Sequence, residues 1–357
     1  AALSIARYTA NDDCAGLADA ELLAKDYPHL DLYYPWELSV EEAIELAKNC
    51  EQAAFAADKR IANSEGATIS VSESQFIYAN SLGFMGGYTL SRHSISCAMI
   101  AEQGDSKQRD YWYSVARDAA DLESAESIGQ KAGIRSAARL GARKIATCET
   151  PVLFEAPVAS SLIGHFASAV SGGNLYRKSS FLLDSIGQQI FAPDIQIIEL
   201  PYIHKGLASS AFDDDGVATV ERKVVENGIV QGYFLGSYSA RKLGMRTTGN
   251  AGGTHNLIMQ NAAPMDFDAL LKKMGTGLLV TELLGHGINA VTGDYSRGAS
   301  GYWVENGEVR YPVEEITIAG NLQEIFQGIL AIGNDVVVRG SKQSGSVLID
   351  HMTVAGG

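Results

Sequence analysis

The sequence predicts an α+β fold with an N-terminal α/β domain followed by a β-rich C-terminal domain that carries hairpins and a few helices. The chain has 357 residues, 46% of them hydrophobic, which is enough material for two buried cores. Its first part reads as helix, strands and helix again, and its second part holds two Asn-Gly pairs between β-rich runs. We expect the domains at residues 1–147 and 148–357.

The first domain is predicted to contain two long helices. Ser39 is a suitable N-cap for a helix over residues 39–57, in which Glu41 and Glu42 favour the positive end and apolar residues recur at helical spacing. A second helix is expected over residues 124–140. Residues 2–7 are typical of the tail of a further helix.

Strands are expected between these helices. Residues 68–72 alternate polar and apolar side chains, as do parts of residues 88–100, and residues 80–83 suit a turn between them. We place the domain boundary at residues 146–151.

The second domain is expected to open with a strand at residues 151–154 and a helix at residues 158–170, and then to be mainly β. Asn227-Gly228 and Asn306-Gly307 suit type I′ hairpin turns, which need positive φ at both central residues. Helices at residues 266–274 and 322–330 are expected to interrupt the strands.

Composition narrows the function classes. Lys and Arg number 28 against 42 Asp and Glu, a net charge of −14, which argues against a nucleic-acid partner because affinity for phosphates depends on Lys and Arg. The four cysteines lack the density and spacing of a disulfide scaffold, and no run approaches the roughly eighteen apolar residues of a membrane span. We expect a soluble, cytoplasmic protein.

One stretch of the second domain is the most informative of the chain. It runs from Gly293-Asp294-Tyr295-Ser296-Arg297 to Gly307, and a second block covers Val170 to Ser180. Both blocks closely resemble the TldD/PmbA family of bacterial peptidases, and the likeness is closest to its PmbA branch, also called TldE. The chain begins at Ala1, without a stretch that the family has before it, so we expect the first domain to be incomplete.

The resemblance implies a zinc site that this chain does not reproduce. Catalytic members are expected to carry H-E-x-x-x-H on a helix and a Cys near the C-terminus, since zinc peptidases use such ligands with a Glu that activates water. In register, these positions hold Ile163, Gly164, Ser168 and, near the Cys position, Ser344. We therefore expect no metal or other cofactor in this chain, and zinc in a partner subunit.

Two other readings of metal chemistry stay open. Glu282 and His286 lie at the spacing of half a zinc site on a helix, although Val280, Leu283 and Leu284 favour a packed element. An independent metallopeptidase would have to draw unorthodox ligands from His165, His286, Glu282 or His255. No nucleophile motif of the G-x-S-x-G type is present.

The leading hypothesis is a PmbA-type, non-catalytic subunit that forms a heterodimer with a TldD-like zinc metalloprotease. The resemblance implies flexible or unfolded peptides as substrates, as in bacteriocin precursor maturation and antitoxin turnover, and a homodimer when the chain is alone. The alternatives are the independent metallopeptidase and a regulatory binding protein, because members of the family have been labelled modulators of DNA gyrase.

The candidate contact residues lie in the segment Gly293 to Gly301. Its glycines predict a sharply turning loop that presents Asp294, Tyr295 and Arg297 either to a substrate chamber or to the domain core. Asp294 and Arg297 are three residues apart, which favours an ion pair between them as the structural reading. The functional reading is contact with a peptide substrate or a partner.

Overall fold

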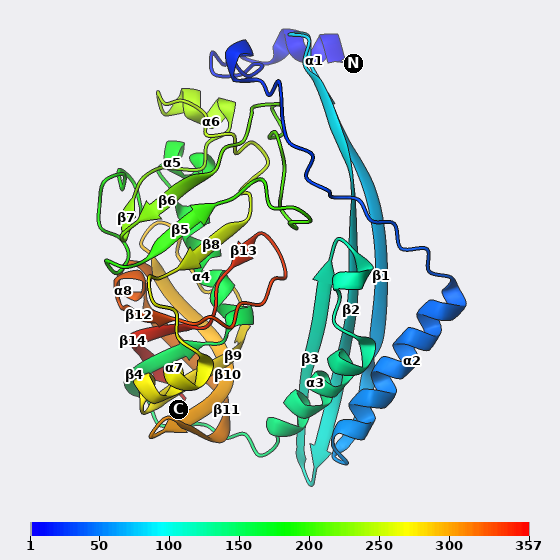
Figure 1. Cartoon of the computed structure of the whole chain (residues 1–357). Coiled ribbons are helices and arrows are strands. Elements are labelled where there is room, and N and C mark those ends of the chain that lie inside the picture. Colours follow the sequence, from blue (N-terminus) through cyan, green and yellow to red (C-terminus); the bar gives the residue numbers. More distant parts are fainter. Residues whose placement is uncertain (1, 357) are drawn as a thin grey trace.

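A computed structural model describes residues 2–356 and shows two α+β regions side by side, which residues 139–147 link along the chain (Figure 1). The first region is a three-stranded antiparallel sheet in the order β1-β2-β3, with helices α2 and α3 packed on one face. Its helices and strands, with the short segments before them, are α1 Ala2–Tyr8, η1 Ala20–Leu22, α2 Val40–Ala57, β1 Ile61–Ala79, β2 Met85–Gln103, β3 Ser106–Ala116, η2 Ala119–Asp121 and α3 Ala125–Ala138.

The two predicted helices form where their capping residues place them. Ser39 caps α2 by accepting from the Glu42 backbone N–H, and the Glu42 carboxylate accepts from the Ser39 backbone N–H in return. Ser124 caps α3 with a single hydrogen bond, accepting from the Ser127 backbone N–H. The two helices approach closely because Gly129 of α3 has no side chain. A Cβ at that position would lie only 1.9 Å from the Cys50 carbonyl oxygen of α2.

The strands of this region are longer than the sequence patterns predict. Residues 68–72 lie inside the 19-residue strand β1, and residues 88–100 lie inside the 19-residue strand β2. The turn at residues 80–83 is confirmed, with Asn80 Oδ1 accepting from the backbone of Leu82 and Phe84. β3 was not predicted, although Gly104 at φ +59° marks the turn before it.

The second region contains two sheets. A six-stranded sheet in the order β11-β10-β9-β4-β14-β12 is closed by an additional pairing of β11 with β14, and a five-stranded sheet has the order β13-β8-β5-β6-β7. The elements are β4 Cys148–Phe154, α4 Ala156–Ala169, α5 Gly172–Tyr176, β5 Gln196–Glu199, β6 Arg222–Glu226, β7 Ile229–Val230, α6 Ser237–Lys242, β8 Leu257–Gln260, α7 Phe267–Met274, β9 Gly277–Leu284, β10 Asp294–Glu305, β11 Glu308–Asn321, α8 Leu322–Gln327, β12 Ile329–Ile332, β13 Lys342–Gln343 and β14 Val347–Ala355.

Both Asn-Gly turns are confirmed. Asn227 and Gly228 have φ values of 51° and 77°, and Asn306 and Gly307 have 55° and 75°, as a type I′ turn requires. The expected α+β class with a β-rich second half is therefore what the chain adopts.

Three element predictions are wrong. The segment around Glu282 is strand β9 and not a helix, because Val152 to Phe154 of β4 and β10 pair with it on either side. The Gly293–Gly301 segment is not a loop, since residues from Asp294 onward form β10. The helix at residues 322–330 ends at Gln327, where Gly328 leads into β12 paired with β14.

Ion pairs join the two regions. Arg135 of α3 donates from Nη1 and Nη2 to the two carboxylate oxygens of Glu155, at 2.7 and 3.0 Å. Arg139 pairs with Glu282 at 2.6 Å. In the part of the chain that the structure describes, no helix is both long and apolar enough to cross a bilayer.

Candidate functional site

Helix α4 carries the three positions that the sequence aligns with H-E-x-x-x-H. Ile163 is fully buried in the main core of the second region. Gly164 lies against Lys342, since a Cβ there would be 3.6 Å from the lysine Cδ. Ser168 is exposed, and its carbonyl oxygen accepts from the Asn174 amide at 2.8 Å.

The surroundings of these positions are positively charged. Burial lowers the pKa of Lys342, whose Nζ donates only to Ser341 Oγ at 3.2 Å. His165 follows Gly164 on α4, and burial, assisted by the charge of Arg297, lowers the pKa of its imidazole to about 4. Ser344 is 1% exposed, and its hydroxyl has no hydrogen-bond partner among the described residues.

These residues do not fit a zinc ion. Zinc takes deprotonated thiolate, imidazole or carboxylate ligands, and neither isoleucine, glycine nor serine supplies one in the aligned positions. No group of three His, Cys, Asp or Glu side chains converges anywhere in residues 2–356. The nearby charges of Arg297 and Lys342 would also repel a cation.

The residues proposed as unorthodox ligands lie in separate places. The Glu282 carboxylate pairs with Arg139, and His286 is exposed in the loop after β9. His255 is buried with its Nε2 3.0 Å from the Gly249 carbonyl oxygen. The half zinc site read from Glu282 and His286 is wrong in its helical geometry, because the two residues do not share a helix.

The three candidate contact residues lie on β10 with different exposures. Asp294 is exposed, and its carboxylate accepts from Thr292 Oγ1 at 2.6 Å and from the Asn321 amide at 3.4 Å. Tyr295 is 1% exposed, lies edge-on to His165 with ring centroids 5.9 Å apart, and burial raises the pKa of its hydroxyl to about 12.

Arg297 is half-buried on the same side of β10 as Tyr295, and its Nε has no partner among the residues that the structure describes. It makes no ion pair with Asp294, because residues three apart on a strand point to opposite faces. The expected Asp294–Arg297 pair is therefore wrong.

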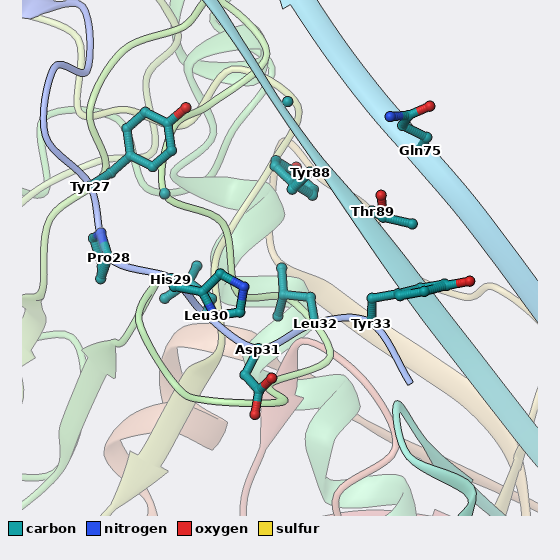
Figure 2. Close-up of a pocket in the computed structure, with 12 residues that line it drawn as sticks. Tyr27, Pro28, His29, Leu30, Asp31, Leu32, Tyr33, Gln75, Tyr88 and Thr89 are labelled. Atoms are coloured by element: carbon teal, nitrogen blue, oxygen red, sulfur yellow. The ribbon is translucent and has the colours of Figure 1, made fainter. Parts of the chain in front are cut away.

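A cavity of about 570 Å³ lies elsewhere in the molecule. Figure 2 shows the N-terminal segment from Tyr27 to Tyr33 on one side of it and Tyr88 and Thr89 of β2 on another. The Leu30 and Leu32 carbonyl oxygens hold this segment in place by accepting from the Lys205 and Ser91 backbone N–H groups. Sequence patterns missed this cavity, because its walls come together only in the folded chain.

In the second region, α4 packs against β9 and β13, so the aligned positions lie on a helix that contacts both sheets. A family model for the PmbA/TldA metallopeptidase central domain matches residues 33–140, and one for the C-terminal domain of the same family matches residues 147–356. The chain belongs to the PmbA/TldA metallopeptidase family, which confirms the resemblance read from the sequence.

Individual relatives support the same family assignment. The chain is 51% identical to Metalloprotease PmbA of Escherichia coli O157:H7, over 100% of this chain and 79% of that protein. It is also similar to crystal structures of two proposed modulators of DNA gyrase. The Thermotoga maritima protein has 32% identity and a TM-score of 0.90 over 99% of this chain and 82% of its own. The Bacteroides thetaiotaomicron protein has 29% identity and a TM-score of 0.93 over 99% and 81%.

Proposed function

We propose that this chain is the PmbA-type, non-catalytic subunit of a cytoplasmic heterodimeric metalloprotease whose TldD-type partner carries the zinc. The observation that supports this most is the occupation of the aligned metal positions by Ile163, Gly164, Ser168 and Ser344, with a lysine side chain packed against Gly164. A chain of a metallopeptidase family without zinc ligands at these positions would contribute to peptide cleavage in a way other than by binding the metal. A TldD-type partner fits because the chain is also 24% identical to Metalloprotease TldD homolog of Haemophilus influenzae over 318 residues.

The proposed contribution is to shape a chamber and hold flexible peptides in it. β1 is an edge strand of 19 residues, so its outer backbone groups have no strand partner among residues 2–356. An extended peptide or a partner can add to such an edge by main-chain hydrogen bonds, which gives affinity with little sequence preference. Peptide substrates of this kind include bacteriocin precursors and antitoxins.

Asp294 and Arg297 are the proposed contacts with the substrate or the partner, and Tyr295 supports them from the core. Substituting Arg297→Ala should lower peptide cleavage by the reconstituted two-subunit enzyme roughly tenfold, as the loss of one charged contact implies. The matched control is Arg310→Ala, which removes an exposed arginine of β11. Unchanged cleavage in Arg297→Ala would remove this residue from the proposed contacts, and failed assembly would make it structural.

The subunit assignment itself is tested by zinc analysis and peptide cleavage on the chain alone, on a TldD-type partner alone, and on the mixture. We expect stoichiometric zinc only with the partner, and cleavage that needs both chains. Chelator-sensitive cleavage by this chain alone, together with one bound zinc, would establish the independent metallopeptidase instead.

A further inference from the structure

A second cavity lies between the two regions, next to the aligned metal positions. It has a volume of about 250 Å³, several times that of a water molecule. Tyr113 of β3, Pro157 and Ser160 of α4, and Arg339 and Lys342 of the C-terminal region line it. In Figure 1 the segment that leads into β13 extends toward β3.

Arg339 lies in this cavity without an acidic partner. Its guanidinium carbon is 4.2 Å from the centre of the Trp112 ring and 3.9 Å from that of Tyr113, so the aromatic rings fix the plane of the group. Its Nε and Nη2 are buried and make no hydrogen bond to any described residue. Burial lowers the pKa of Arg339, which expresses the cost of leaving this charge uncompensated.

The carboxylate that attracts Arg339 is already engaged by another arginine. Glu155 attracts Arg339, but both of its oxygens accept from Arg135 at 2.7 and 3.0 Å. Arg135 itself adds positive charge to the surroundings of Arg339. A buried guanidinium needs a counter-ion, and no residue in the described part of the chain supplies one to Arg339.

Lys342 adds a second cation on the same wall. Its ammonium forms no ion pair with a carboxylate of the described residues, and burial lowers its pKa. Pro157 and Ser160 are three residues apart on α4, so one face of that helix near its N-terminus forms part of the cavity wall. Ser341 brings a hydroxyl donor to the same space, whereas the Ser160 hydroxyl donates to the Pro157 carbonyl oxygen at 3.2 Å.

We propose that this cavity binds a carboxylate, specifically the C-terminal carboxylate of an extended peptide. The planar guanidinium of Arg339 is suited to bidentate contact with a carboxylate, and the Lys342 ammonium supplies a point charge beside it. Where catalytic relatives are expected to hold a cation, this chain thus places two cations that hold the end of the peptide. The inference rests on the proposed role in peptide handling and adds the chemical group that is recognised.

A peptide is favoured over a free ion by the position of β13. This two-residue strand is at the edge of the five-stranded sheet and pairs with β8, and among the described residues no strand pairs with its other side. A peptide that ends at Lys342 can run beside an edge strand of the chain, which a free anion does not require.

The test uses one unstructured, N-terminally fluorescein-labelled peptide in two forms, with a free C-terminal carboxylate and with a C-terminal carboxamide. Fluorescence anisotropy on the purified chain should give at least tenfold tighter binding of the carboxylate form. Lys342→Met and Arg339→Met should each remove most of this difference. The matched control, Lys273→Met, removes an exposed lysine of α7 and should preserve it.

Equal affinity for the two peptide forms would overturn the proposal, and so would a difference that survives in Lys342→Met or is equally lost in Lys273→Met. Displacement of the peptide by inorganic phosphate, at concentrations where acetate has no effect, would assign the cavity to a phosphate instead. Because Arg339 also stacks between aromatic rings, thermal unfolding is measured for each variant, and Lys342→Met decides if Arg339→Met fails to fold. The assay needs neither zinc nor a partner subunit, so its failure is distinguishable from failure of the subunit assignment.

Discussion

At the scale of single residues, His165 is the titratable side chain next to the aligned metal positions. It is adjacent to Gly164, its Nε2 is buried without a partner among the described residues, and Tyr295 packs edge-on against its ring. Burial first, and then the charge of Arg297, lower the pKa of this histidine from 6.5 to about 4. The imidazole is therefore neutral in the folded chain at neutral pH.

This shift predicts a pH dependence of stability. The unfolded chain takes up a proton at His165 below its ordinary pKa of 6.5, whereas the folded chain does so only near 4. The stabilisation is complete above pH 6.5 and is lost as the pH falls toward 4. Between pH 7 and pH 4.5 the loss should be about 2–3 kcal/mol.

Urea unfolding of the wild-type chain and of His165→Phe at these two pH values measures the effect. The phenylalanine keeps an aromatic ring against Tyr295 and cannot titrate. The wild type should lose about 2–3 kcal/mol more than the variant between the two pH values. Equal losses in the two proteins would mean that His165 is protonated normally in the folded chain.

The residue types at the aligned metal positions are informative without any knowledge of the fold. Ile163, Gly164, Ser168 and Ser344 exclude zinc ligation by their chemistry alone, whatever the fold around them. Exposure is a different matter, because Asp294 and Tyr295 are neighbours in the sequence and yet one is exposed and the other buried. That difference follows from the alternation of faces along β10.

At the scale of elements, the glycines of the family signature serve strand packing. A Cβ at Gly301 would lie 1.8 Å from the Leu279 carbonyl oxygen of β9, at a point where the β9–β10 register shifts. Only a residue without a side chain lets the two strands approach so closely.

Gly301→Ala should therefore destabilise the chain by about 1–3 kcal/mol or more, since a backbone atom has to move. Gly340→Ala is the control, because a Cβ there meets nothing within 4 Å, and it should change stability by less than about 0.5 kcal/mol. Denaturant unfolding compares them. A neutral effect of Gly301→Ala would show that β9 and β10 adjust more easily than the close approach implies.

At the scale of the whole molecule, partly buried charges lie at the contact between the two regions. Arg135 holds Glu155, and its Nε lies 3.4 Å from Asp110, whose side chain is 7% exposed. Removing the arginine leaves two carboxylates in a poorly solvated interface, which costs more than the ion pair itself contributes.

Arg135→Met should lower the free energy of unfolding by about 2–4 kcal/mol. The double variant Arg135→Met with Glu155→Gln should recover part of this loss, because one stranded charge is neutralised. Urea unfolding of both variants, with Lys273→Met as the surface control, measures the recovery. Additive losses in the double variant would indicate that the interface is stabilised by packing and not by charge.

Self-association remains a prediction for the isolated chain. Val40, Ile44 and Phe55 are exposed on α2 and recur at helical spacing, so they form an apolar stripe on that helix. A second copy of the chain can cover such a stripe in a symmetric dimer. Light scattering at micromolar concentration should give the mass of a dimer, and Ile44→Asp should shift it toward the monomer. A monomeric wild-type chain would contradict the prediction.

The sequence by itself determined the family, the α+β class, the helix caps at Ser39 and Ser124, the two Asn-Gly turns and the residue types Ile163, Gly164 and Ser168 at the aligned metal positions. Each of these depends on residue identity or on neighbours within a few positions. Only the tertiary structure decided that residues 281–284 and 294–301 are strands, because pairing with distant segments overrides local preference. It also decided the cavity at Arg339 and Lys342, whose walls come from β3, α4 and the segment before β14 and meet only when the two regions pack together.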